Sequence, residues 1–204
     1  MKAILLAGGK GTRLRPLTIH TPKPVVPIFD RAFLHYQIDL LKQVPEIDEV
    51  ILSLNYQPRR IEEVFGDGAG TGVRLRYVVE PSPLGTAGGV RRCADLLGET
   101  FLLVYGDNLT TCRFDALVDL HRANAGIATI ALFWRDDVSA HSAVERRADG
   151  RIVRFVEKPR PDQAPSHWIS AGVVVFEPRI MAFIPPGRPA DFGFVVFPAL
   201  LAAG

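Results

Sequence analysis

The sequence predicts an α/β fold, in which a mostly parallel central sheet is flanked by helices and followed by a smaller β-rich segment. Short apolar runs alternate with helix-like stretches through the first two thirds of the chain, which is typical of repeated βαβ units. A glycine-rich turn follows the first apolar run. From Ser142 onward, strand-like runs are joined by a turn at Ala148-Asp149-Gly150, so we expect the last third to be rich in β-structure.

Each predicted strand is a short apolar run, and each predicted helix has apolar residues at helical spacing. Asp30 and Thr86 stand just before two of these helices and are expected to be their N-caps. In chain order the elements are strand 3–7, helix 32–44, strand 50–54, helix 59–65, strand 73–79, helix 87–97, strand 101–105, helix 114–125, strand 127–133, strand 152–156 and strand 169–176.

Length and composition limit the class of protein. A chain of 204 residues suits one domain, 1–204. The 24 Lys and Arg against 22 Asp and Glu are too balanced to favour nucleic acid as a partner. Cys93 and Cys112 form no CxxC motif, which favours a reducing cytosol without structural zinc. The first apolar run has about five residues, too few for a signal peptide, and no run reaches the ~20 of a membrane span. We therefore expect a soluble, cytoplasmic protein.

The segment from Leu6 to Pro16, LAGGKGTRLRP, is suited to binding phosphate. Glycines let backbone N–H groups face an anion, and guanidinium groups match phosphate oxygens. A P-loop is excluded because Lys10 precedes Gly11, and Leu14 stands where a dinucleotide fingerprint needs its last glycine. The second mismatch disfavours a nicotinamide-dependent dehydrogenase. The alternative is an ordinary glycine-rich turn.

Two charged residues strengthen the phosphate-binding interpretation. Lys23 lies between Pro22 and Pro24, whose fixed φ angles make a stiff segment that places its charge in advance. Asp107 follows the predicted strand 101–105, and parallel sheets bind ligands beyond the carboxyl ends of their strands. The alternatives are a surface lysine and a turn aspartate. Near a phosphate loop, we interpret Asp107 as a Mg²⁺ ligand, because Mg²⁺ is commonly held by one or two carboxylates together with substrate phosphates.

Six segments together resemble one family of enzymes. They are LAGGKGTRLRPLT at 6–18, TPKPVVP at 21–27, EPSPLGTAG at 80–88, YGDN at 105–108, FVEKP at 155–159 and SAGVVVF at 170–176. In this order they resemble the sugar-1-phosphate nucleotidylyltransferases, also called nucleotide-sugar pyrophosphorylases. The resemblance covers essentially the whole chain and leans toward mannose-1-phosphate guanylyltransferases. It implies a Rossmann-like sheet whose β-rich C-terminal third is a sugar-binding lid.

The reaction that the resemblance implies is attack by a sugar-1-phosphate oxygen on the α-phosphorus of a nucleoside triphosphate. The products are a nucleotide-sugar and pyrophosphate, and the cofactor is Mg²⁺. GTP and mannose-1-phosphate are the expected substrates, with glucose-1-phosphate and dTTP or UTP as the alternative. No general base is needed, because a phosphate monoester with a second pKa of about 6 is already largely dianionic near neutral pH. The catalyst must instead bring two anions together and neutralise their charge.

The resemblance also assigns roles to residues. Arg13, Lys23 and Asp107 would be catalytic, and Asp107 would hold the metal ion. The partners would be the two substrates and, as an open possibility, a second copy of the chain. The nucleotide would be bound by Leu6, Ala7, Gly8, Gly9, Gly11, Thr12, Arg13, Glu80, Gly85 and Thr86. The sugar phosphate would be bound by Asn108, Glu157, Lys158 and Gly172.

The sequence departs from the family pattern at three places. Val195 and Phe194 stand in the stretch DFGFVVFP at 191–198, where the family pattern D-F-G-x-D-V-F-P has an acid in place of the valine. Ser142 replaces a glycine, and the chain ends at Gly204, before a tryptophan- and glycine-containing tail. We expect Val195 to weaken metal binding and Val195→Asp to raise activity. These departures keep open a second class, a non-catalytic nucleotide-sugar-binding regulatory homologue.

Overall fold

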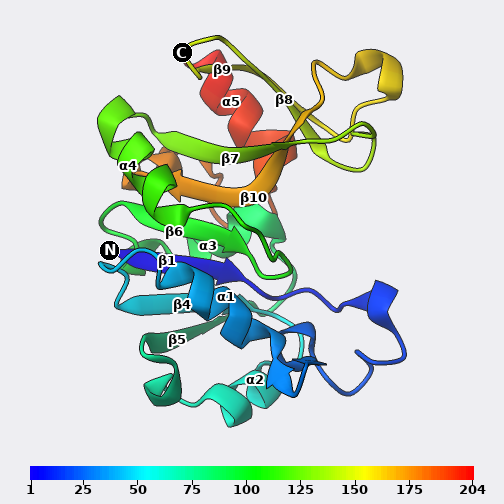
Figure 1. Ribbon diagram of the computed structural model, residues 1–204, viewed down its shortest axis with the longest axis vertical. Coiled ribbons are helices and arrows are strands. Elements are labelled where there is room, and N and C mark those ends of the chain that lie inside the picture. Colours follow the sequence, from blue (N-terminus) through cyan, green and yellow to red (C-terminus); the bar gives the residue numbers. More distant parts are fainter.

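The computed structural model describes residues 1–204 and is built on one eight-stranded sheet, with a separate two-stranded hairpin (Figure 1). The strand order is β5-β4-β1-β6-β10-β8-β9, and β7 pairs with β10. The strands are β1 (Lys2–Leu6), β2 (Pro27–Ile28), β3 (Arg31–Ala32), β4 (Glu49–Leu54), β5 (Arg74–Val79), β6 (Phe101–Tyr105), β7 (Ala128–Trp134), β8 (Ser142–Arg146), β9 (Ile152–Glu157) and β10 (Trp168–Phe176). The helices are α1 (Phe33–Leu41), α2 (Pro58–Phe65), α3 (Gly85–Arg92), α4 (Phe114–Asn124) and α5 (Phe197–Ala202). None of them is long and apolar enough to cross a membrane.

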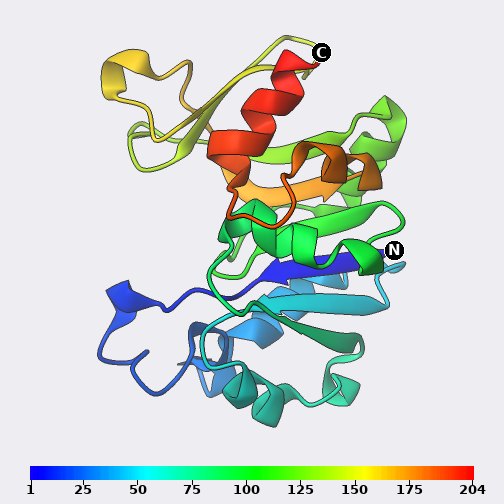
Figure 2. The same ribbon diagram turned by 180° about the vertical axis from the view of Figure 1, so that it is seen from behind.

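The predicted parallel sheet is confirmed. Strands β5, β4, β1 and β6 are parallel neighbours, and within the sheet only β10 and β9 run in the opposite direction. Helices α1, α2 and α4 pack on one face of the sheet, while α3 and α5 pack on the other (Figures 1 and 2). The central strands read as continuous apolar runs because both of their faces are buried.

The β-rich C-terminal third is present and continues the main sheet. Strand β10 lies between β6 and the pair β7 and β8, and β9 forms the edge next to β8. The expected turn joins β8 to β9, where the Gly150 N–H donates to the Arg147 carbonyl (3.0 Å) and the Asp149 carboxylate accepts from the Arg151 N–H (2.9 Å). These strands therefore extend the same sheet whose strand β1 leads into the glycine-rich loop (Figure 1).

The prediction that Asp30 caps the first helix is wrong. Helix α1 begins at Phe33, and Asp30 lies in the turn of the β2–β3 hairpin with a φ of 64°. Phe29 beside it has a φ of 47°. Two-residue hairpin turns require positive φ angles at their central positions, and aspartate tolerates that region better than most residues. The Asp30 position therefore serves the hairpin.

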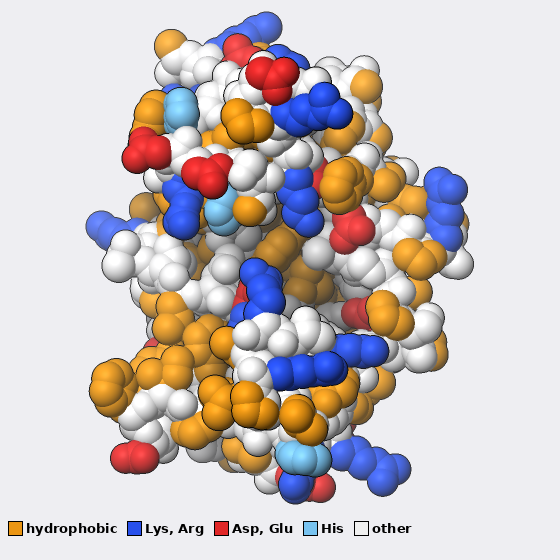
Figure 3. Space-filling model, turned by 90° about the vertical axis from the view of Figure 1, so that its right-hand side faces the viewer, with side chains coloured by type: hydrophobic (Ala, Val, Ile, Leu, Met, Phe, Trp, Pro, Cys, Tyr) orange, Lys and Arg blue, Asp and Glu red, His pale blue; other side chains and the backbone are white.

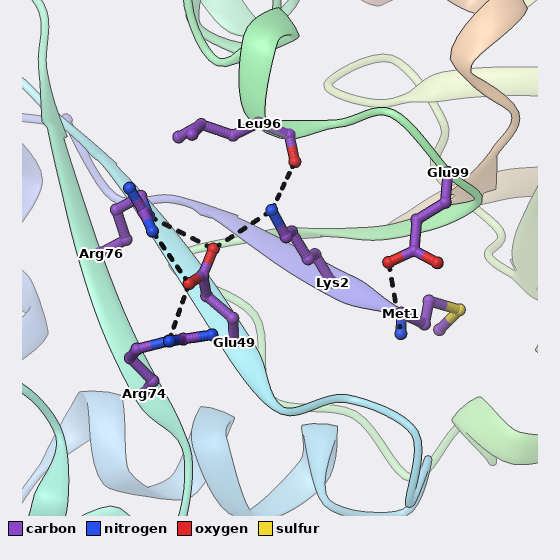
Figure 4. Close-up of polar contacts among 7 residues, drawn as sticks. All are labelled: Met1, Lys2, Glu49, Arg74, Arg76, Leu96 and Glu99. Carbon is purple, nitrogen blue, oxygen red and sulfur yellow. Dashed lines mark hydrogen bonds and ion pairs between the residues drawn. The ribbon is translucent and has the colours of Figure 1, made fainter.

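An ion-pair cluster around the buried Glu49 carboxylate lies at the amino ends of β1, β4 and β5 (Figure 4). The Glu49 side chain is only 1 % exposed and lies 2.8 Å from Arg74 Nε, 3.2 Å from an Arg76 guanidinium nitrogen and 3.4 Å from Lys2 Nζ. Burial acts to raise the pKa of the Glu49 carboxyl, but hydrogen bonds from Arg76 and Lys2 outweigh it and hold that pKa below its ordinary value. This cluster lies at the opposite ends of the strands from the predicted site.

Candidate active site

A cavity of about 690 Å³ opens at the carboxyl ends of the parallel strands. Figure 3 views this side of the molecule and shows a hollow with Lys and Arg side chains beside it. Ligands of open α/β sheets bind in this position. The cavity brings together the predicted residues Leu6, Ala7, Gly8, Gly9, Gly11, Thr12, Arg13, Lys23, Glu80, Gly85, Thr86 and Asp107.

The glycine-rich loop leaves β1 and lines one wall of the cavity. Gly11 has a φ of 60°, and a Cβ there would stand 3.0 Å from the Thr18 side chain, whose hydroxyl donates to the Gly11 carbonyl (2.7 Å). No atom lies within 4 Å of where a Cβ of Gly9 would stand, so its backbone is open to a ligand. The loop enters a short 3₁₀ turn, Thr12–Leu14, and not the long helix that a dinucleotide fingerprint precedes.

Lys23 and Asp107 form an ion pair inside the cavity. Lys23 Nζ lies 3.0 Å from Asp107 Oδ2, and the two side chains are 26 % and 44 % exposed. Lys23 starts a 3₁₀ turn after Pro22, and Asp107 lies in the turn after β6. The two charged residues that the sequence singled out independently are therefore in contact.

The donor set of the cavity suits Mg²⁺ only if substrate completes the coordination. No group of three or more His, Cys, Asp or Glu side chains could hold a metal ion. Asp107 supplies one partly exposed carboxylate, and Mg²⁺ is commonly bound by one or two carboxylates plus phosphate oxygens and water. The residues present therefore fit a Mg²⁺ ion that arrives with a triphosphate.

The segment 80–88 forms a second wall of the cavity. Glu80 is buried, and its carboxylate accepts hydrogen bonds from the Ser53 hydroxyl (2.8 Å) and the Leu84 N–H (2.9 Å). Gly85 has a φ of 74°, and a Cβ there would stand 2.6 Å from the Ala190 carbonyl oxygen. The chain near Ala190 therefore packs closely against this wall.

The prediction that Thr86 caps the third helix is also wrong. Helix α3 begins one residue earlier, and the Asp191 carboxylate accepts hydrogen bonds from the Thr86 N–H (3.0 Å) and hydroxyl (3.1 Å). Asp191 lines the cavity and was not among the predicted site residues. Asp191 is the first residue of the stretch DFGFVVFP, whereas the metal-binding acid that the family pattern predicts stands four residues later, at Val195.

Tyr105 is a second cavity residue that the sequence analysis did not single out. Burial raises the pKa of its phenol to about 12. The hydroxyl therefore stays protonated near neutral pH.

The predicted sugar-phosphate residues do not line the cavity. The Asn108 side chain donates to the Ala171 carbonyl (2.6 Å), and Gly172, with a φ of 67°, leaves no room for a Cβ next to that amide. The Glu157 carboxylate accepts a hydrogen bond from the Ser142 hydroxyl, so Ser142 contacts one of these residues directly.

Lys158 and Val195, two further positions that the sequence singled out, lie in irregular backbone. Lys158 has a φ of 48°, and its N–H donates to the His141 carbonyl (2.9 Å). Val195 lies in a π-helical turn, Phe192–Val196, and is absent from the cavity wall. That position 195 is a metal-ligand position, and that Val195→Asp raises activity, both stay predictions.

Sequence comparison places the chain in a family. The profile described as "Nucleotidyl transferase" matches residues 2–204. The chain belongs to this nucleotidyl transferase family. This match and the similar proteins below together confirm the resemblance to sugar-1-phosphate nucleotidylyltransferases.

Two curated relatives illustrate the range within the family. The chain is 39 % identical over 203 residues to the mannose-1-phosphate guanylyltransferase of Mycobacterium tuberculosis, with 99 % of this chain and 56 % of the relative covered. It is 34 % identical over 218 residues to the UTP–glucose-1-phosphate uridylyltransferase of Synechocystis, with 100 % and 56 % covered. The chain thus spans a little over half the length of these relatives.

Two solved structures share the fold. A putative glucose-1-phosphate thymidylyltransferase from Bacillus anthracis, crystallised with sucrose, matches with a TM-score of 0.89 at 22 % identity, covering 100 % of this chain and 84 % of the other. HddC from Yersinia pseudotuberculosis, complexed with GMP-PN, matches with a TM-score of 0.76 at 26 % identity, covering 97 % and 85 %. The first match supports the fold alone, while the second also shows a guanine nucleotide bound to a member of this fold.

Proposed function

We propose that this chain transfers a nucleotidyl group from a nucleoside triphosphate to a sugar-1-phosphate and releases pyrophosphate. The observation that carries the proposal is the Lys23–Asp107 ion pair facing a glycine-rich loop in one cavity. An enzyme that joins two anions needs cations and open backbone amides, and this cavity supplies both.

The chemistry follows from the charges. A phosphate oxygen of the sugar-1-phosphate attacks the α-phosphorus, and the bond from that phosphorus to the oxygen bridging to the β-phosphate breaks. Arg13 and the loop amides hold the triphosphate, and Lys23 neutralises negative charge near the α-phosphorus. Asp107 would hold Mg²⁺, which would supply positive charge to neutralise phosphate oxygens. The cavity needs no histidine base for this reaction.

We propose GTP as the triphosphate, and Glu80 supports this choice. Its buried carboxylate lines the cavity and can only accept hydrogen bonds when ionised. The Watson–Crick edge of guanine offers two neighbouring donors, N1–H and the 2-amino group, whereas uracil and thymine offer one N–H between two carbonyl oxygens. A carboxylate attracts the first pattern and repels the flanking oxygens of the second.

Mannose-1-phosphate is the proposed sugar, because the relatives at 39 % and 35 % identity are mannose-1-phosphate guanylyltransferases. Glucose-1-phosphate with UTP or dTTP is the alternative, supported by the uridylyltransferase relative. A non-catalytic nucleotide-sugar-binding homologue is the alternative class, because Val195 stands where the family pattern has an acid. Cys93 and Cys112 are both free thiols, which supports our proposal of a cytoplasmic location.

The test is pyrophosphate release with GTP, UTP, dTTP and ATP, each combined with mannose-1-phosphate and glucose-1-phosphate in the presence of Mg²⁺. We expect the highest kcat/KM with GTP and mannose-1-phosphate. Pyrophosphate release that never exceeds that of Asp107→Asn with any pair would overturn the proposal. Glu80→Gln should lower the preference for GTP over UTP by about tenfold or more, corresponding to one altered buried hydrogen bond of ~1.4 kcal/mol.

A further inference from the structure

The turn that carries Asp107 is fixed from several directions. It is closed by the Asn108 N–H, which donates to the Tyr105 carbonyl (3.0 Å). The Gly106 N–H donates to the Leu6 carbonyl at the end of β1 (2.9 Å), and the Asn108 side chain donates to a carbonyl of β10 (2.6 Å). The backbone of the turn is thus anchored to the strands on both sides of β6.

A third anchor comes from helix α1. Gln37 is only 1 % exposed, and its side-chain Nε2 donates both to the Tyr105 carbonyl and to the Asn108 carbonyl, each at 3.1 Å. These carbonyls belong to the first and last residues of the turn. The amide group therefore spans the turn and uses both of its donor hydrogens there.

The other half of the Gln37 amide is unsatisfied. Its Oε1 atom is buried and has no hydrogen-bond partner. An unpaired buried acceptor is destabilising, so an apolar side chain of similar length would suit this position better if packing alone mattered. The two hydrogen bonds that Gln37 Nε2 donates to the turn therefore explain why an amide stands at this position.

We infer that Gln37 is a positioning residue that fixes Asp107 against Lys23. This inference rests on the proposed function, in which both charges act on the substrates. Helix α1 also meets the Lys23 segment, because the Phe33 N–H donates to the Val26 carbonyl (3.0 Å). One helix therefore sets the positions of both partners of the 3.0 Å ion pair, although Gln37 itself does not reach the cavity.

The test uses Gln37→Met, which keeps the length and burial of the side chain and removes both donors together with the unpaired oxygen. Because a displacement of about 1 Å can cost 10²-fold in rate, we expect kcat to fall about 10- to 100-fold. The KM for the triphosphate should stay within about threefold, since the glycine-rich loop is untouched. The matched control is Gln43→Met beyond the far end of α1, which removes a similar contact, Gln43 Oε1 accepting from the Phe114 N–H (3.1 Å), and should leave kcat unchanged.

Hydrogen exchange without substrates gives a second readout. The Asn108 amide should exchange faster in Gln37→Met than in the parent, while the amides of β6 keep their protection. Parent-like kcat, or a lower kcat with unchanged Asn108 exchange, would overturn the inference. Loss of protection throughout β6 would also overturn it, because Gln37 would then support the fold in general. If the parent releases no pyrophosphate, the proposed function fails, and the exchange experiment still decides whether Gln37 holds the turn.

Discussion

Replacing Glu49 by glutamine tests how much the ion-pair cluster at the amino ends of the strands stabilises the fold. The Glu49→Gln side chain keeps its size and one acceptor oxygen but loses the negative charge. It leaves Lys2, Arg74 and Arg76 facing a neutral amide. Removing one partner of a fully buried ion pair costs about 3–5 kcal/mol.

The expected cost is lower than that range because the cations are not buried. The side chains of Lys2, Arg74 and Arg76 are 27 %, 64 % and 46 % exposed, so water continues to hydrate their charges after the substitution. Hydrogen bonds to a charged group contribute about 1.5–3 kcal/mol, and we expect the free energy of unfolding to fall by roughly 2–3 kcal/mol. For a chain of this length the Tm should fall by about 4–12 °C.

The pH dependence provides an independent check. The pKa of Glu49 is held below its ordinary value of 4.5, so the stabilisation is fully present above that pH and is lost as the pH falls through the lower pKa of the folded protein. The gap in unfolding free energy between the parent and Glu49→Gln should therefore be constant near neutral pH and narrow under acidic conditions. Urea titrations from neutral pH to well below the ordinary pKa of 4.5 measure it.

The matched control is Glu63→Gln. Glu63 pairs with Arg60 at 3.2 Å on the surface of α2, where both side chains are largely exposed, and its substitution should change the unfolding free energy by less than about 0.5 kcal/mol. If Glu49→Gln and Glu63→Gln have equal effects, the reasoning about the buried carboxylate is refuted. Unchanged kcat in Glu49→Gln is also expected, since the cluster lies at the far ends of the strands.

Three further predictions concern the cavity. Asp107→Asn should abolish Mg²⁺-dependent turnover while the Tm changes little, because the side chain is 44 % exposed; turnover within tenfold of the parent at saturating Mg²⁺ would contradict the assignment. Arg13→Ala and Lys23→Ala should each lower kcat/KM by about 10²–10³-fold, the effect of losing one preorganised electrostatic group, and parent-like kinetics in Lys23→Arg would show that Lys23 is only a surface charge. Asp191→Ala removes the acceptor for Thr86 and should raise the KM for the triphosphate more than it lowers kcat, as initial rates at varied triphosphate will show.

The strands were predictable because their neighbours bury them on both faces. The run at 101–105 matches β6 residue for residue, and the run at 50–54 misses only Glu49 at the start of β4. Glu49 was missed because a charged residue in an apolar strand is exceptional, and the cations that accommodate it come from the neighbouring strands β1 and β5.

The helix starts and the details of the site were less predictable. A capping rule searches the few residues before a helix, but the acceptor at the start of α3 is Asp191, 105 residues after Thr86. No motif marks Gln37 in the sequence, because its contacts with the Asp107 turn depend on how α1 packs on β6. The motifs predicted many of the residues that line the cavity, whereas the contacts that orient them come from tertiary packing.

The place of β10 in the sheet affects how the chain can fold while it is being synthesised. Strands β6 and β7 do not pair with each other. Strand β6 pairs with β1 on one side and with β10 on the other, whereas β7 pairs with β10 alone. A ribosome that has translated only as far as β7 therefore carries two strands with open edges and apolar side chains. Such edges are templates for intermolecular pairing. The growing chain stays vulnerable to aggregation until Phe176 has emerged and β10 has inserted between the two strands.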